Sequence, residues 1–79
     1  MKKVIFLGSS LDDLRRFPAT ARHQAGFEID GMQRGKNPSD WKPLKIVGPG
    51  VQELRIHKEG EHRVVYLAKL EETVYVLHA

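Results

Sequence analysis

The fold class is decided by residues 51–79, VQELRIHKEGEHRVVYLAKLEETVYVLHA. Three runs in this stretch are rich in β-branched and aromatic residues, which predicts strands over Val51–His57, His62–Leu70 and Thr73–Ala79. The links between them, Lys-Glu-Gly-Glu and Glu-Glu, are short enough for tight turns. Because strands with such short links pair with their neighbours in sequence, we expect an antiparallel meander.

Two further strands are expected upstream of this stretch. Lys3–Leu7 is a short apolar run closed by Gly8, which is typical of a buried strand. After Pro43 the helical pattern gives way to a strand-like one, and Leu44–Val47 is predicted to open the meander. The Gly-Pro-Gly sequence that follows favours a turn into the next strand.

Two helices are predicted between these strands. A short helix follows Ser9 or Ser10, either of which can cap it, and it stops at Pro18. A second helix is expected over Ala19–Gln33, with Gly35 as its C-cap. Helical spacing predicts that one face of the second helix comprises Ala21, Ala25, Glu28, Ile29 and Met32.

Together these elements predict an α+β fold, in which an N-terminal strand and two helices pack on one face of a small antiparallel sheet. The chain has 79 residues, which suits one domain over residues 1–79. It has no cysteine, which excludes disulfides and thiolate metal sites. The longest apolar run, Val4–Leu7, is too short for a membrane span or a signal peptide. We therefore expect a cytoplasmic protein that does not bind membranes.

The charge of the chain is unevenly distributed. The formal net charge is +3, but the segment from Arg34 to Lys69 holds eight Lys and Arg against four acidic residues. Such a basic segment favours a phosphate-bearing partner, although a solvated surface gives the same composition.

Several common kinds of site are not found in the sequence. The Gly-Pro-Gly turn does not have the spacing of a phosphate-binding loop, and no Ser/His/Asp set can be proposed. The four histidines lack the close spacing of a zinc site, so we expect surface or hairpin histidines and neither a metal nor a small-molecule cofactor.

Two arginines are the strongest candidates for chemistry. Alternation along the predicted strand places Glu53, Arg55 and His57 on one face, and Arg63 begins the next strand across a hairpin. If these strands pair, the two guanidinium groups converge on one phosphate, which arginine binds bidentately. They would then stabilise the charge that develops when an RNA 2′-hydroxyl attacks that phosphate.

Ion pairing is the alternative for both arginines. Arg55 would pair with Glu53 or Glu61, and Arg63 with Glu61 or Glu71. Composition alone favours this ion-pair interpretation over phosphate binding.

Other residues have more than one possible role. Lys42 and Lys45 are placed to contact backbone phosphates at the sheet edge. Trp41 would either stack on a base or anchor the core, and Tyr66 is expected in the core because its same-face neighbours are apolar. His78 has a side chain suited to proton transfer, close to the chain end.

The sequence resembles the phage-derived, HigB-like branch of the RelE/ParE toxin superfamily. The similarity covers nearly the whole chain in order. It is carried by PSDWKPL at 38–44, GVQELRI at 50–56, HRVVYLAKL at 62–70 and VYVLHA at 74–79. The resemblance implies a small sheet with two N-terminal helices. It also implies a toxin of a type II toxin–antitoxin system: a metal-independent endoribonuclease that cleaves mRNA on the ribosome, inhibits translation and is neutralised by an antitoxin.

The resemblance also assigns residues by position. Arg63 matches the arginine that contacts the scissile phosphate, although His62 stands where the family usually has an aromatic residue. Arg55 matches a basic position that faces RNA on the preceding strand. The candidate catalytic residues are thus Arg55, Arg63 and His78. The candidate RNA- or ribosome-binding residues are Lys42, Lys45 and Lys69.

Two expectations qualify this function. Related chains usually continue past the position of Ala79 with a basic segment, so we expect a truncated domain with weak or absent nuclease activity and retained antitoxin binding. The alternatives to the nuclease are a ParE-like toxin that inhibits gyrase and a non-catalytic antitoxin-binding module.

Overall fold

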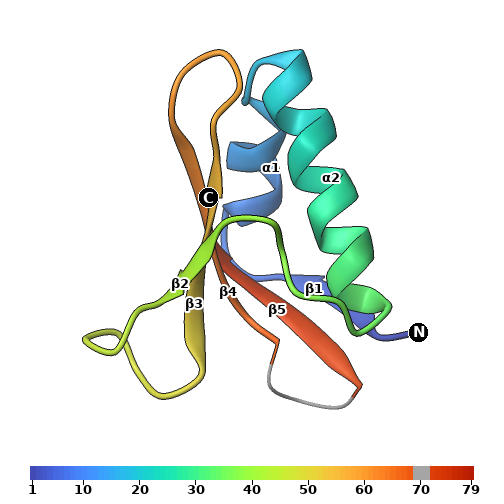
Figure 1. The fold of residues 1–79 in the computed structure, drawn as a ribbon, viewed down its shortest axis with the longest axis vertical. Helices are drawn as coiled ribbons and strands as arrows, with labels where there is room; N and C mark the ends of the chain where they lie inside the picture. The colour runs from blue at the N-terminus through green and yellow to red at the C-terminus, as the bar shows by residue number, and fades with distance from the viewer. Residues whose placement is uncertain (69–71) are drawn as a thin grey trace.

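In the computed structural model, which describes residues 1–68 and 72–79, two helices cover one face of a five-stranded sheet (Figure 1). The strands are β1 (Lys3–Phe6), β2 (Trp41–Pro43), β3 (Val51–Ile56), β4 (His62–Leu67) and β5 (Thr73–His78). The helices are α1 (Ser10–Arg15) and α2 (Ala19–Gln33). The predicted α+β class is confirmed.

The sheet is mixed, whereas the sequence predicted an antiparallel one. Its strand order is β1-β5-β4-β3-β2, and the meander from β2 to β5 is antiparallel as expected. The first strand, β1, pairs in parallel with β5, with Lys3 opposite Thr73 and Phe6 opposite Val76. The chain between β1 and β5 contains both helices and the three other strands, so local sequence pattern gives no sign of the direction in which β1 pairs.

The second error concerns the strand that opens the meander. Leu44–Val47 was predicted to be a strand, but β2 ends at Pro43, and the backbone N–H of Val47 donates to the carbonyl of Leu44 at 3.1 Å in a turn. The N–H of Leu44 donates to the carbonyl of Val51 at 2.8 Å, which closes the hairpin at this point. Ile46 therefore lies fully exposed in the loop, despite its high β propensity.

Helix α2 has the predicted bounds and the predicted buried face. Its buried residues are Ala21, Ala25, Glu28, Ile29 and Met32. Gly35 follows the helix with φ +82°, a left-handed conformation that suits the residue after a helix end. Helix α1 is held against the sheet by Ser10, whose buried hydroxyl donates to the carbonyl of Val76 at 3.2 Å.

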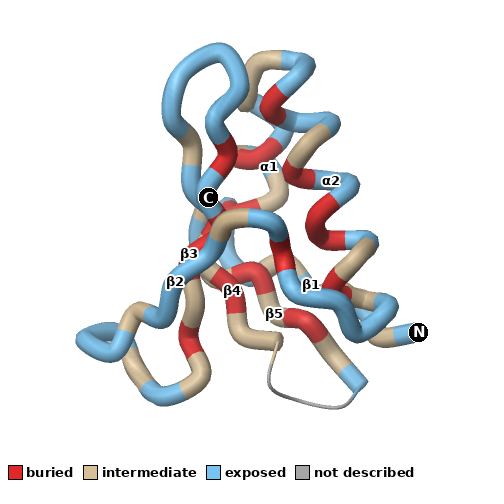
Figure 2. Tube along the Cα trace, viewed as in Figure 1, coloured by how far each residue is buried: buried red, intermediate tan, exposed pale blue. Residues whose placement is uncertain are grey.

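The core lies between the helices and the sheet, and Figure 2 shows buried segments in the strands and in both helices. Tyr66 is fully buried there, as the sequence predicted. The core cluster comprises Leu14, Ala21, Ala25, Ile29, Met32, Leu54, Ile56, Val64, Tyr66, Val74 and Val76. Each large aliphatic or aromatic side chain buried in this way contributes about 1.5–3 kcal/mol.

Among residues 1–68 and 72–79, no helix lies over the opposite face of the sheet. The side chains of β4 and β5 on this face, those of Val65, Leu67, Tyr75 and Leu77, are only half-buried. Trp41 is also partly exposed and does not anchor the core. The open face is therefore accessible along both strands, and it carries the charged residues described next.

Candidate nucleic-acid interface

The two arginines predicted to converge lie directly opposite each other. In the register of β3 and β4, Arg55 is the partner of Arg63. Strand alternation turns both side chains to the open face, since Leu54 and Val64 beside them are fully buried in the core. The hairpin therefore places two guanidinium groups side by side at the surface.

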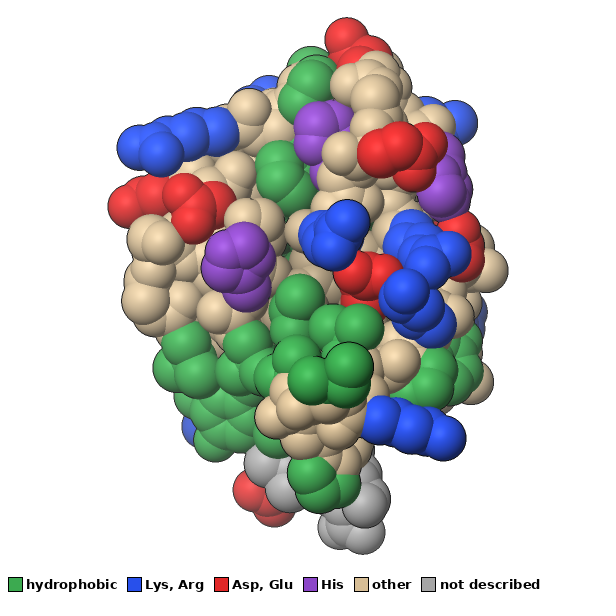
Figure 3. All heavy atoms as spheres, turned by 90° about the vertical axis from the view of Figure 1, so that its left-hand side faces the viewer, with side chains coloured by type: hydrophobic (Ala, Val, Ile, Leu, Met, Phe, Trp, Pro, Cys, Tyr) green, Lys and Arg blue, Asp and Glu red, His purple; other side chains and the backbone are tan. Residues whose placement is uncertain are grey.

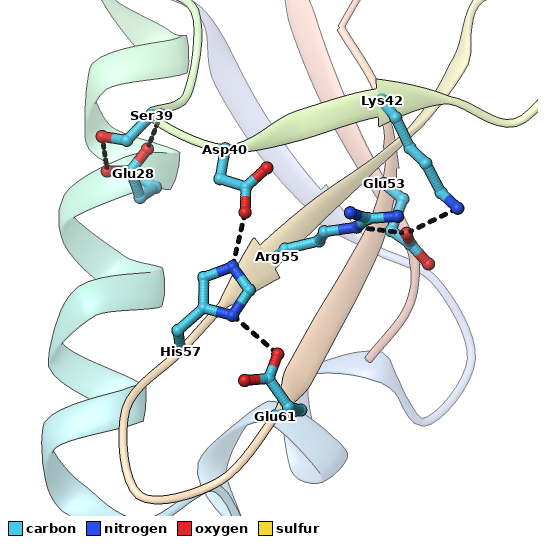
Figure 4. A network of polar contacts seen from close by, with 8 residues as sticks. All are labelled: Glu28, Ser39, Asp40, Lys42, Glu53, Arg55, His57 and Glu61. Carbon is cyan, nitrogen blue, oxygen red and sulfur yellow. Dashed lines mark hydrogen bonds and ion pairs between the residues drawn. The ribbon is translucent and has the colours of Figure 1, made fainter.

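A single buried carboxylate, that of Glu53, holds these cations together. Arg55 contacts it through Nε at 3.2 Å from Oε2, and Arg63 through Nη1 at 3.4 Å from Oε1. Lys42, opposite Glu53 in the register of β2 and β3, adds Nζ at 3.7 Å from Oε2. Figure 4 shows Lys42 and Arg55 pointing toward Glu53 from two neighbouring strands.

The exposure of these four side chains differs sharply. The side chain of Glu53 is 5% exposed, whereas that of Arg63 is 72% exposed. Lys42 and Arg55 lie between these values. Each of the three cations is therefore still accessible to solvent on the side away from Glu53. Three cations and one carboxylate give the cluster a formal net charge of +2.

His57 continues the same face at the end of β3. Its Nδ1 lies 2.6 Å from Oε2 of Glu61, and its Nε2 contacts the carboxylate of Asp40 (Figure 4). The hydrogen bonds to Asp40 and then Glu61 raise the pKa of His57 above its ordinary value of 6.5. An imidazolium that donates both N–H groups is the form that two carboxylates favour.

These residues line a hollow of about 300 Å³ on the open face. Figure 3 shows basic side chains gathered there around an acidic one, with an apolar area below them. His62 at the hairpin end also lines the hollow, and its ring contacts that of Phe17 in a tilted arrangement with 4.7 Å between ring centroids. The lining residues are Lys42, Glu53, Arg55, His57, Glu61, His62 and Arg63.

The comparison with protein families places the chain in a family with a phage origin. The profile of the Phage derived protein Gp49-like family (DUF891) matches residues 12–79. The chain belongs to the Gp49-like family. This is a family of RelE/toxin-like proteins of toxin–antitoxin systems, so the chain is a phage-derived, toxin-like protein. No curated protein and no solved structure shows significant similarity to it.

In this Gp49-like protein, three of the six candidate site residues come together. Arg55, Arg63 and Lys42 share the hollow. Lys45 lies exposed in the β2–β3 loop and His78 exposed at the end of β5, and neither lines the hollow. Lys69 lies outside the described residues.

The ion-pair alternative is correct for Arg55 and partly correct for Arg63. Arg55 pairs with Glu53, as that alternative predicted. Arg63 also pairs with Glu53 and, within the described part of the chain, not with Glu61, which instead contacts His57. Glu71 lies outside the described residues. Because each arginine keeps N–H groups that face solvent, ion pairing and phosphate binding are compatible here.

Two members of the site were not singled out from the sequence. Glu53 was treated only as a partner of Arg55, and His57 only as a surface histidine. The signal that identifies them is the alternation that puts Glu53, Arg55 and His57 on one face of one strand. Acidic residues are seldom buried, and those that are buried are usually paired with charged groups. The burial of Glu53 among three cations is therefore the feature that distinguishes this site.

Residues 1–68 and 72–79 contain no group of three or more His, Cys, Asp or Glu side chains that could hold a metal ion. None of the helices within the same residues combines the length and the apolar character that a bilayer crossing needs.

Proposed function

We propose that this Gp49-like protein is the toxin of a type II toxin–antitoxin system and that it cleaves mRNA on the ribosome. The observation that carries the proposal is the convergence of Lys42, Arg55 and Arg63 on the buried Glu53. Membership of the Gp49-like family supports the toxin-like character of the protein. The cluster of three cations supports the proposal that the group bound at this site is a phosphate.

The arginines are suited to the chemistry of an RNA phosphate. Arg55 uses Nε for Glu53, which leaves its two terminal nitrogens for a bidentate contact with phosphate oxygens. When a 2′-hydroxyl attacks, it loses its proton to solvent and forms a bond to phosphorus, and the bond from phosphorus to the 5′-oxygen then breaks. Between these events negative charge grows on the phosphorane oxygens beside Arg55 and Arg63. Cations held in place before the reaction stabilise that charge, and one such donor contributes about 3 kcal/mol.

We assign proton transfer to His57 because it lines the hollow that the arginines line. The raised pKa of His57 favours the imidazolium, which is an acid able to protonate the leaving 5′-oxygen. Asp40 and Glu61 hold the ring by both nitrogens, so the proton given up would come from one of these two hydrogen bonds. His78 remains the alternative acid from the sequence.

The experiment is induced expression followed by primer extension on cellular mRNA. The 79-residue chain is compared with the same chain carrying an added basic C-terminal segment, because the resemblance predicts that such a segment supplies cations. Arg55→Gln and Arg63→Gln test the site, and Lys58→Gln is the matched control, an exposed lysine of the same hairpin that does not line the hollow.

We expect the extended chain to cleave mRNA within translated codons and the 79-residue chain to cleave weakly or not at all. In the extended chain, both arginine variants should abolish cleavage and the Lys58 variant should keep it. Growth arrest with trapped gyrase–DNA complexes and intact mRNA would replace this proposal by a ParE-like function. No arrest and no cleavage from either chain, with tight antitoxin binding, would leave a non-catalytic module.

A further inference from the structure

A second cavity lies on the other side of the sheet, between the end of α2 and the strands. Its volume is about 160 Å³, roughly ten times the space that one water molecule needs. Its walls come from the N-terminus, the segment after α2, β3 and β4. The lining residues on which the argument depends are Lys2, Met32, Lys36, Pro38, Gln52 and Tyr66.

The floor of this cavity is a cross-strand pair of polar side chains. Gln52 and Tyr66 lie directly opposite each other in the register of β3 and β4. Alternation directs them to the helix side, away from the hollow that contains Arg55 and Arg63. The two sites are therefore on opposite faces of the sheet, and a ligand in one does not occupy the other.

The hydroxyl of Tyr66 is the unexplained group. Tyr66 is fully buried, and its Oη has no hydrogen-bond partner among the described residues. An unpaired buried hydroxyl costs about 1–3 kcal/mol, so a partner that is absent from the chain itself would stabilise the fold. Burial raises the pKa of Tyr66 to about 12, so the hydroxyl stays protonated and is available as a donor.

The charges of the cavity select the kind of partner. Lys2 and Lys36 line it, and no acidic side chain among residues 1–68 and 72–79 does. Lys2 reaches across the cavity, where its Nζ donates to the carbonyl of Ala68 at 2.9 Å. The charge of Glu28 acts on Tyr66 and raises its pKa, but Glu28 does not line the cavity, and its carboxylate accepts hydrogen bonds from Ser39 at 2.7 and 2.8 Å and from Gln24 at 3.0 Å. The charged side chains that line the cavity are thus both cations.

We propose that this cavity binds a small organic anion through a carboxylate or phosphate group, with Tyr66 donating a hydrogen bond and Lys2 and Lys36 supplying the charge. Met32 and Pro38 offer apolar contact for the rest of such a ligand. The cavity is smaller than sites for drug-sized ligands, which fits a metabolite of a few heavy atoms. This inference does not depend on the nuclease proposal.

The test is a residue-resolved NMR titration of the 79-residue chain. Sodium acetate and sodium phosphate are the two probes, with sodium chloride keeping the ionic strength constant. The side-chain amide of Gln52 and the backbone amide of Tyr66 report on the cavity. The Arg55 and Arg63 signals report separately on the hollow, so the two proposals can fail independently.

The decisive variant is Tyr66→Phe, which removes the hydroxyl and keeps the ring. Tyr75→Phe, at the half-buried tyrosine on the open face, is its matched control, and Lys36→Gln tests the charge at an exposed position that does not endanger folding. Since a hydrogen bond to a charged group is lost, we expect Tyr66→Phe to weaken saturable binding about tenfold. Lys36→Gln should weaken it less, and Tyr75→Phe not at all.

Binding of acetate alone would identify a carboxylate as the group that the cavity recognises, and binding of phosphate alone would identify a phosphate. Either result supports the proposal. Shifts confined to the Arg55 and Arg63 signals would overturn it. So would equal affinity of the wild type and Tyr66→Phe, because the hydroxyl would then contact only water.

Discussion

Arg55 and Arg63 face each other across β3 and β4, and both guanidinium groups contact the carboxylate of Glu53. Like charges directly opposite on a sheet are destabilising. Glu53 offsets that repulsion, and Lys42 joins the same carboxylate from the edge strand. The protein thus holds a cationic cluster in a fixed arrangement, which is what the proposed electrostatic catalysis requires.

Replacing Glu53 by Gln should destabilise the fold. The variant leaves three cations close together without their shared counter-charge, and the loss is about 1–3 kcal/mol because the cations themselves are partly solvated. Urea unfolding at pH 7 measures it. The control is Glu72→Gln, an exposed acid with no ion pair among the described residues. Equal stability of Glu53→Gln and the control would mean that Glu53 does not organise the cluster.

Binding of single-stranded RNA should depend on salt through the same three cations. If Lys42, Arg55 and Arg63 each neutralise one phosphate, the plot of log K against log salt has a slope near −2, since each contact to a single strand contributes about −0.7. Arg63→Gln should reduce the slope by about 0.7 and weaken binding to all sequences similarly. Lys58→Gln serves as control, and a slope that Arg63→Gln leaves unchanged would exclude this residue as a phosphate contact.

His57 should make the stability depend on pH. Its folded-state pKa is raised by Asp40 and Glu61, so its contribution is fully present below the ordinary value of 6.5. The contribution is lost as the pH rises through the raised pKa. His57→Gln should therefore be less stable than the wild type at pH 6, with a difference that shrinks at alkaline pH. Unfolding curves across this range measure it, with His78→Gln as the control. A difference independent of pH would show that packing, not the imidazolium, accounts for the effect.

The sequence predicted what depends on local pattern. The spacing of Ala21 and Ile29 identified the buried face of α2, and strand alternation identified the open face of Arg55. Prediction from the sequence failed where contacts between distant segments determine the structure. The stretch Leu44–Val47 has strand-like composition, but the hairpin register, with Pro43 opposite Gln52, leaves it in the loop.

The environment of His57 was beyond local pattern for the same reason. Its two carboxylates come from Asp40, in the segment before β2, and from Glu61, on the far side of the hairpin. Only the pairing of β2, β3 and β4 brings these segments together. Local sequence pattern therefore could not predict that His57 lies between two carboxylates. The buried state of Glu53 likewise depends on side chains from three strands.

Glu59 joins the β3–β4 hairpin to the start of α2. The first turn of α2 has no acidic residue and its N-cap, Pro18, makes no capping hydrogen bond. Glu59 takes this role from a distant position: its Oε2 accepts from the backbone N–H of Thr20 at 3.2 Å and from the Thr20 hydroxyl. Figure 1 shows the hairpin beside this end of the helix. A carboxylate at a helix N-terminus is also favoured by the helix dipole.

Glu59→Gln should therefore lower the unfolding midpoint at pH 7, with Lys58→Gln as the neighbouring control. The hydrogen bonds from Thr20 lower the pKa of Glu59 below its ordinary 4.5, so its contribution is present above pH 4.5 and disappears as the pH falls through the folded-state pKa. The wild type and the variant should thus converge in acid. Glu59 also has φ +51°, which glycine adopts without strain, so Glu59→Gly loses the carboxylate but relieves the backbone. Glu59→Gly should accordingly be more stable than Glu59→Gln, and a Gln variant as stable as the wild type at every pH would show that the hairpin does not cap the helix.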